Sequence, residues 1–84
     1  MAKPEQTATA VNYLRDLGYL VREAAVEARD QSRASAGDGF EAGRAAAYHE
    51  MASLMAGQAQ AFGLDLSALA FDGFDPDRDL LGAP

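Results

Sequence analysis

Apolar side chains recur every three or four residues between positions 39 and 62, the spacing of a helix with one apolar face. Asp38 can accept hydrogen bonds from the free amides of the first turn, and Glu41 completes a predicted capping box. Gly63 is a typical residue to end such a helix. We therefore predict a helix over about 39–62. Its seam steps by four and three through Phe40, Arg44, Ala47, Met51, Leu54, Gln58 and Ala61, flanked by Tyr48, Met55 and Phe62. Its back face holds Ala45, His49, Ala52 and Ala56.

A second helical pattern covers about 7–35, and Pro4 suits a first helical turn, so its start is set only to within a turn. The apolar stripe of this helix runs through Ala10, Leu14, Leu17, Val21, Ala24, Ala28 and Gln31. Four small residues, Gly18, Ala24, Ala25 and Ala28, would let another backbone approach closely. The opposite face is expected to be solvated and carries Asn12, Arg15, Asp16, Tyr19, Arg22, Glu23, Arg29, Asp30 and Arg33.

The connection at 35–38 is short, so the chain must reverse its direction in a tight turn and the two helices should lie side by side and antiparallel. The tail over 63–84 reads as irregular, with one short helical turn after Asp65 and another after Asp75-Pro76. Seven apolar residues should strap this tail over the helices: Leu64, Leu66, Leu69, Phe71, Phe74, Leu80 and Leu81. The chain, 1–84, is thus expected to be a single all-α domain.

Two polar residues, Arg44 and Gln58, interrupt the seam of the 39–62 helix. In one interpretation the aliphatic part of the Arg44 side chain packs along the seam and its guanidinium is exposed to solvent. In a second, it pairs with a carboxylate of a facing helix and fixes the register, and a ligand contact is a third. The sequence leaves all three open.

A chain of 84 residues without cysteine rarely builds a sufficient core alone, and no disulfide can help it. We therefore predict that two hairpins dimerise into a four-helix bundle. The predicted bundle core is Leu14, Leu17, Val21, Ala47, Met51, Leu54, Met55 and Phe62. The predicted interface is Leu14, Leu17, Val21, Arg44, Tyr48, Met51, Leu54, Met55 and Phe62. Turns at one end or at opposite ends of the dimer are equally compatible with the pattern.

The formal net charge is −6, and the excess acid lies in the second half, where residues 45–84 carry one arginine against six acidic residues. Such a surface argues against nucleic acid as a partner, because phosphate binding needs a basic footprint. The start of the chain has no apolar leader, and no stretch is apolar enough to span a membrane. A cytoplasmic protein is the expectation that follows.

Little in the chain indicates chemistry. Aspartates at 75, 77 and 79 resemble half of a calcium loop, but Leu80 stands where the loop needs glycine, so we expect no metal site. His49 is the only histidine and falls on the back face, which disfavours a Ser-His-Asp set. No glycine-rich phosphate loop is present. We expect neither enzymatic activity nor a cofactor.

The stretches Phe40-Glu-Ala-Gly-Arg-Ala-Ala-Ala-Tyr-His-Glu-Met-Ala-Ser-Leu54, Gln60-Ala-Phe-Gly-Leu64 and Asp75-Pro-Asp-Arg-Asp-Leu-Leu81 resemble small uncharacterised bacterial proteins of the helical-hairpin kind. This resemblance implies the hairpin fold and no activity. The small acidic hairpins of type VII secretion are a second comparison. They carry Trp-x-Gly in the turn, and this chain has no tryptophan.

The expected function is a small interaction or regulatory module that works by binding another protein. An antitoxin or immunity-type protein is a second hypothesis, in which the acidic tail neutralises a basic toxin. A third, from a different class, is a ligand- or metal-binding bundle around Arg44, Tyr48 and Glu50 at the dimer interface.

Overall fold

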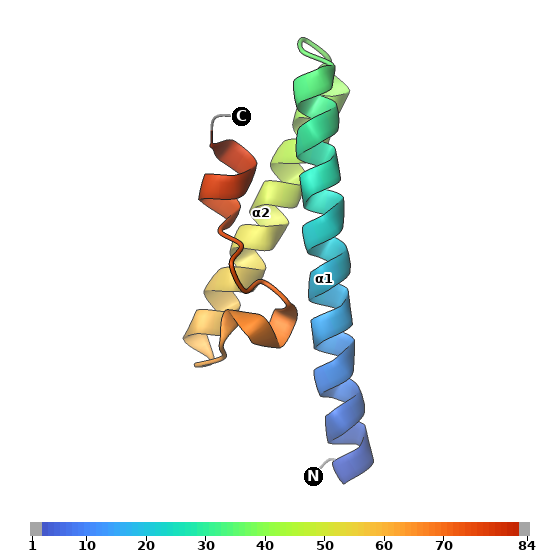
Figure 1. Ribbon diagram of the computed structural model, residues 1–84, viewed down its shortest axis with the longest axis vertical. Helices are drawn as coiled ribbons and strands as arrows, with labels where there is room; N and C mark the ends of the chain where they lie inside the picture. The colour runs from blue at the N-terminus through green and yellow to red at the C-terminus, as the bar shows by residue number, and fades with distance from the viewer. Residues whose placement is uncertain (1–2, 83–84) are drawn as a thin grey trace.

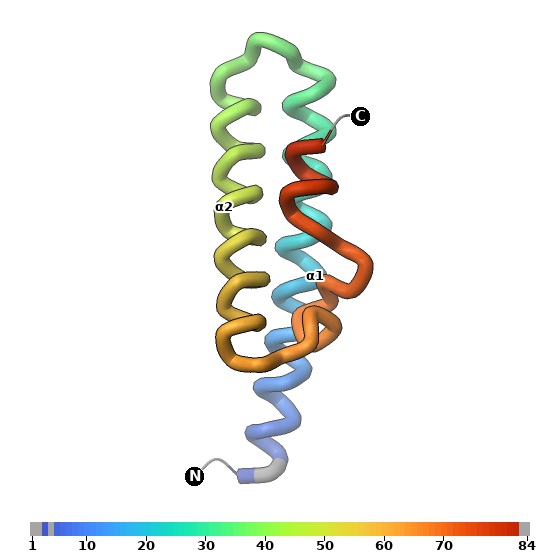
Figure 2. The backbone as a smooth tube through the Cα atoms, turned by 90° about the vertical axis from the view of Figure 1, so that its left-hand side faces the viewer, coloured from blue at the N-terminus to red at the C-terminus, as the bar shows by residue number. Residues whose placement is uncertain are grey.

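The computed structural model describes residues 3–82 and consists, within them, of helices and their connections. Helix α1 spans Pro4–Ala34 and α2 spans Gly39–Ala61. Two short helical turns follow, η1 at Leu66–Leu69 and η2 at Asp77–Leu81. The two long helices form the predicted antiparallel hairpin, and the tail runs back along its side toward the turn (Figures 1 and 2). The domain measures 50 × 18 × 17 Å.

The ends of the helices follow the local signals in the sequence. The Asp38 carboxylate accepts from the amides of Phe40 and Glu41, as predicted. Helix α1 begins at Pro4, about a turn before the predicted start. Gly63, with φ of +70°, ends α2, and the Leu64 amide closes the cap by donating to the Ala59 carbonyl at 2.8 Å.

The predicted capping box at Asp38 is only half formed. Its second half needs the Glu41 carboxylate to accept from the Asp38 amide. That amide instead donates to the Ser35 carbonyl at 2.9 Å, within the turn between the helices. Glu41 is left with one buried carboxylate oxygen that has no hydrogen-bond partner, 3.9 Å from the Arg44 guanidinium.

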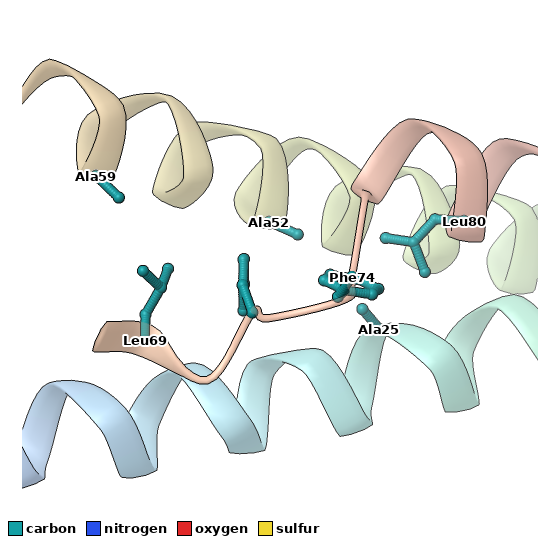
Figure 3. Close-up of a cluster of buried hydrophobic side chains, with 7 residues drawn as sticks. Ala25, Ala52, Ala59, Leu69, Phe74 and Leu80 are labelled. Atoms are coloured by element: carbon teal, nitrogen blue, oxygen red, sulfur yellow. The ribbon is translucent and has the colours of Figure 1, made fainter. Parts of the chain in front are cut away.

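The core lies between the two long helices and the tail (Figure 3). The helices contribute small side chains: Ala25 and Ala28 from α1, Ala52 and Ala59 from α2. The tail contributes the large buried ones, which are Leu69, Phe71, Phe74 and Leu80. Because alanine leaves room between the helices, bulky tail residues can fill the space, and the tail is a third layer of the fold.

One prediction about the packing is therefore wrong, and a second, the core of the dimeric bundle, stays a prediction because the structure holds a single chain. The back face of α2 is a core face, with Ala52 fully buried and Ala45, His49 and Ala56 half-buried beneath or beside the tail. Conversely, Leu17, Met51, Leu54 and Phe62, all placed in the predicted bundle core, are exposed in the chain by itself. The other large members, Leu14, Val21 and Met55, are half-buried, and Ala47 is exposed.

At Gly18 the backbone of the tail lies directly against α1. A Cβ atom added at this glycine would lie 1.9 Å from the Leu69 carbonyl oxygen, so η1 rests directly on the helix backbone. The predicted close approach at small residues of the first helix is confirmed here. Of the seven predicted tail anchors, Leu69, Phe71, Phe74 and Leu80 are buried and Leu66 is half-buried against them, whereas Leu64 and Leu81 remain exposed.

Candidate functional site: an open apolar face beside a clamped tail

An apolar face of the hairpin remains uncovered on the flank that the tail does not occupy. Two hollows of about 380 and 290 Å³ lie along this flank, the first between α1 and α2 and the second between these helices and the start of the tail. The first is lined by Leu20, Val21, Ala24, Ala47, Tyr48 and Met51. The second is lined by Leu14, Leu54, Met55, Gln58, Ala59, Phe62, Leu64 and Leu69. We call the two hollows and their rims the open face.

Large apolar side chains on the open face are strongly exposed. Leu54 is 66% and Phe62 is 78% exposed, and Leu17, Leu20 and Met51 are also open to solvent. No charged residue occurs anywhere from Met51 to Leu64. A single exposed leucine is ordinary, but a contiguous apolar surface of this kind on a small domain is typical of an interaction site.

The residues predicted as an interface lie together on this face. Val21, Tyr48 and Met51 line the first hollow. Leu14, Leu54, Met55 and Phe62 line the second. Leu17 lies on α1 one turn from both Leu14 and Val21, and its exposed side chain continues the same surface. The structure holds one chain, so burial of these residues by a partner stays a prediction.

Arg44 lies at the edge of the open face and interacts within its own helix. Its guanidinium carbon is 5.5 Å from the centre of the Tyr48 ring, and its nearest carboxylate is Glu41, one turn earlier. Glu50 is about 160° around α2 from Tyr48, so it lies away from this pair. The suggested ligand cluster of Arg44, Tyr48 and Glu50 is therefore not assembled within one chain.

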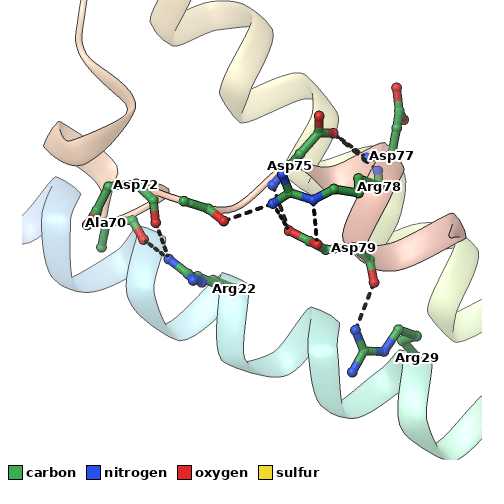
Figure 4. A network of polar contacts seen from close by, with 9 residues as sticks. Arg22, Arg29, Ala70, Asp72, Asp75, Asp77, Arg78 and Asp79 are labelled. Carbon is green, nitrogen blue, oxygen red and sulfur yellow. Dashed lines mark hydrogen bonds and ion pairs between the residues drawn. The ribbon is translucent and has the colours of Figure 1, made fainter. Parts of the chain in front are cut away.

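The tail is held to α1 by a column of arginines that bind its main chain (Figure 4). Arg22 donates to the carbonyls of Ala70 and Asp72, both at 3.0 Å. Arg29 donates to the Asp79 carbonyl at 2.8 Å, and Arg33 binds the Gly82 carbonyl. The prediction that this face is merely solvated is wrong for these arginines.

Aromatic contacts strengthen the same attachment. The Arg22 guanidinium lies 5.0 Å from the centre of the Phe74 ring, a cation–π geometry. Phe74 in turn packs edge-on against Phe71, with ring centres 5.1 Å apart. The turn between the two rings forms as predicted, with the Phe74 amide donating to the Phe71 carbonyl and Gly73 at a φ of +72°.

A serine, a histidine and an aspartate meet where η2 contacts α2, but they do not form a catalytic triad. The Asp77 carboxylate lies 2.8 Å from Nε2 of His49, and the Ser53 hydroxyl lies 3.4 Å from that same nitrogen. A triad needs the aspartate on one ring nitrogen and the serine on the other. With both groups on Nε2, the histidine cannot relay a proton from serine while held by aspartate.

The remaining tail aspartates are engaged within the tail. The Asp75 carboxylate accepts from the amides of Asp77 and Arg78 and so starts η2, as predicted. Asp79 accepts from the Arg78 side chain and from the Asp75 amide, and these bonds lower its pKa to about 2. Across residues 3–82, no three histidine or acidic side chains gather as a metal site would require.

No helix within the described range combines the length and apolar character needed to cross a membrane. No protein family, no curated protein and no solved structure matches this chain.

Proposed function

We propose that this protein is a small, non-enzymatic interaction module that acts as a homodimer through its open face. The observation that carries the proposal is the exposure of Met51, Leu54 and Phe62 within the uncharged stretch from Met51 to Leu64. A second copy would bring an identical apolar face, and a two-fold axis makes such a face self-complementary. Two hairpins joined in this way form a four-helix bundle.

The arrangement of the tail supports this choice of surface. The tail already fills the other flank of the hairpin, where Phe71 is fully buried and the arginine column binds its carbonyls. The open face is therefore the surface of the described residues that we expect a partner to cover. The non-enzymatic part of the proposal rests on the geometry around His49, which does not suit proton relay.

Replacement of Leu54 by alanine tests the homodimer. In a lone chain Leu54 is 66% exposed, so its truncation should barely change folding. In the dimer the side chain becomes buried, and the loss should cost about 2–5 kcal/mol, which raises the dimer dissociation constant at least about 30-fold. Light scattering over a dilution series measures this against the 8.8 kDa mass of the chain.

Leu81 supplies the matched control, because it is 63% exposed but lies in η2, outside the open face. Leu81→Ala should leave the dissociation constant unchanged. A native chain that stays monomeric at millimolar concentration would overturn the homodimer. Equal effects of Leu54→Ala and Leu81→Ala would show that any dimer uses another surface.

A further inference from the structure

Charged side chains are sorted by sign around helix α1. At about 100° per residue, its arginines fall within about 40° of one another on the flank that binds the tail: Arg15, Arg22, Arg29 and Arg33. Its acidic residues fall within about 60° on another flank, centred about 100° further round: Glu5, Asp16, Glu23, Glu27 and Asp30. The acidic flank adjoins the open face.

Glu23 and Glu27 form the edge of the open face on α1. A third hollow, of about 560 Å³, lies along α1 and shares Leu20 and Ala24 with the first hollow of the open face. Both glutamates line this third hollow and are exposed. Neither carboxylate forms an ion pair within residues 3–82. Two negative charges, one helical turn apart, therefore stand beside the apolar groove.

The opposite edge of the open face, on α2, is nearly free of charge. No charged residue occurs from Met51 to Leu64, which is most of this edge. Arg44 lies nearer the turn, where its guanidinium is already beside the Tyr48 ring and 3.9 Å from Glu41. An occupant of the open face therefore meets an apolar floor, an acidic edge on α1 and an uncharged edge on α2.

A second copy of the chain covers the apolar floor but has few cations to set beside the acidic edge. Its Arg22, Arg29 and Arg33 bind tail carbonyls, and its Arg78 is paired with Asp79 at 2.9 Å. Each copy also adds its own pair of glutamates, so the homodimer accumulates like charges. Complementary charge is what selects a partner among surfaces of similar shape. The charge pattern of the open face is therefore better matched by a basic protein.

We propose that the open face also binds a basic amphipathic helix of another protein, which takes the place of the second copy. This inference rests on the interaction role proposed above and names the class of partner. Tyr48 and Phe62 line the first and the second hollow and are about 21 Å apart along α2, so about four turns of helix fill the groove. Apolar side chains of the partner, spaced by four and three, occupy the hollows.

Charge fixes the orientation of this partner as well as its class. Because only the α1 edge of the groove is acidic, the basic flank of the helix faces α1 and its uncharged flank faces α2. Two lysines or arginines three or four positions apart reach Glu23 and Glu27, which have the same spacing. The formal net charge of −6 adds a general attraction that speeds encounter with a basic protein.

Two designed helical peptides of about 21 residues test the charge complementarity. Both carry leucines spaced by four and three. One has lysines along one flank of the leucine stripe, and the other has glutamates in their place. Fluorescence anisotropy measures the binding of each to the full chain at about 0.15 M salt, where charges more than about 8 Å away are largely screened. The lysine peptide should bind more tightly than the glutamate peptide.

Reversing one charge of the acidic edge should reduce this preference. Glu27→Lys should weaken binding of the lysine peptide about 2- to 30-fold and strengthen binding of the glutamate peptide. Glu50→Lys is the matched control, because it makes the same change of charge at an exposed site of α2 away from the open face. It should leave the preference unchanged. Equal effects of the two variants would overturn the inference, because binding would then follow net charge alone.

Competition with the second copy separates this inference from the homodimer. Light scattering should show the lysine peptide converting dimers into complexes that contain one chain. A dimer that binds the peptide and stays intact would overturn the inference, because the peptide would then occupy another surface. A dimer that ignores the lysine peptide would overturn the inference and leave the homodimer standing. A monomeric chain that binds the peptide and is weakened by Glu27→Lys would overturn the homodimer and support the inference.

Discussion

Replacing Gly18 by alanine should destabilise the protein, although the same change in a helix ordinarily stabilises it. Glycine inside a helix is about 1 kcal/mol less favourable than alanine, so an exposed helical site gains from the exchange. At Gly18 the new Cβ would lie 1.9 Å from the Leu69 carbonyl oxygen and 2.7 Å from its carbonyl carbon. These are main-chain atoms, so no side chain can rotate to relieve the clash.

The size of the effect follows from what must move. Real Cβ contacts lie beyond about 3.0 Å, so η1 must shift by more than 1 Å away from α1. That shift loosens Leu69, which is 2% exposed, and pulls on the fully buried Phe71 beside it. Overpacking of this kind costs about 1–3 kcal/mol, and the helix-propensity gain offsets about 1 kcal/mol of it. The expected net result is a loss of up to about 2 kcal/mol in the free energy of unfolding, where an exposed helical site would gain about 1 kcal/mol.

Denaturant unfolding of the wild type, Gly18→Ala and Gly57→Ala provides the assay. Gly57 is the matched control, because it is a helical glycine whose added Cβ meets nothing within 4 Å. Gly57→Ala should raise the free energy of unfolding by up to about 1 kcal/mol. Gly18→Ala should fall below the control by about 1–3 kcal/mol and speed amide exchange in η1. Equal stabilisation by both would refute the close contact between η1 and α1.

Two further predictions concern the tail. Phe71→Ala removes a fully buried ring and should lower the free energy of unfolding by about 3–5 kcal/mol. Denaturant unfolding measures this loss. A loss below about 1 kcal/mol would contradict the tail's role as a layer of the core. Acid should weaken the hydrogen bonds of Asp79 to Arg78 and to the Asp75 amide, because they lower its folded-state pKa from 3.8 to about 2. The contribution of these bonds to folding stability is complete above pH 3.8 and is lost as the pH falls through 2. Carboxyl chemical shifts follow this titration, and Asp79→Asn should abolish the step in nearby tail amides.

The helices and their order could be predicted because their signals are local. Asp38 and Gly63 mark the ends of α2 by backbone chemistry that needs no tertiary contact. The short turn then requires the hairpin. The tail's turns were also predictable, since Asp75 with Pro76 and the glycine at 73 act within a few residues. Boundaries shifted by no more than about a turn.

The buried face could not be predicted in the same way, because helical periodicity favours large apolar side chains. In α2 these are Met51, Leu54 and Phe62, and they lie outward in the chain. The helices meet instead along alanines, which carry a weak signal on their own. Their bulky complement, Phe71 and Leu80, lies in a tail with no periodic pattern. The core could have been identified from two features taken together: alanines spaced along one face of each helix, and large apolar residues in the tail that could fill the space beside them.

The contacts of the arginine column with the tail also could not be predicted from the sequence. Arg22 and Arg29 are seven residues apart, so they share one flank of α1. Sequence alone suggests a solvated stripe, since their partners are main-chain carbonyls and every residue type has one. The regular spacing of the donor arginines can be seen in the sequence. Their acceptors cannot, because main-chain carbonyls do not depend on residue type. Such a contact can be found only once the path of the tail is known.

The division of the hairpin into two faces explains why the predicted seam is informative although it is not the core of one chain. The tail completes the alanine-lined face, so the domain has a core without burying Leu54 or Phe62. Folding of the single chain therefore does not require large apolar residues at those positions. Their repeat by four and three is the pattern by which helices pack on other helices. A surface with that repeat, free of charge from Met51 to Leu64, is the surface on which the second hairpin of the proposed homodimer would pack.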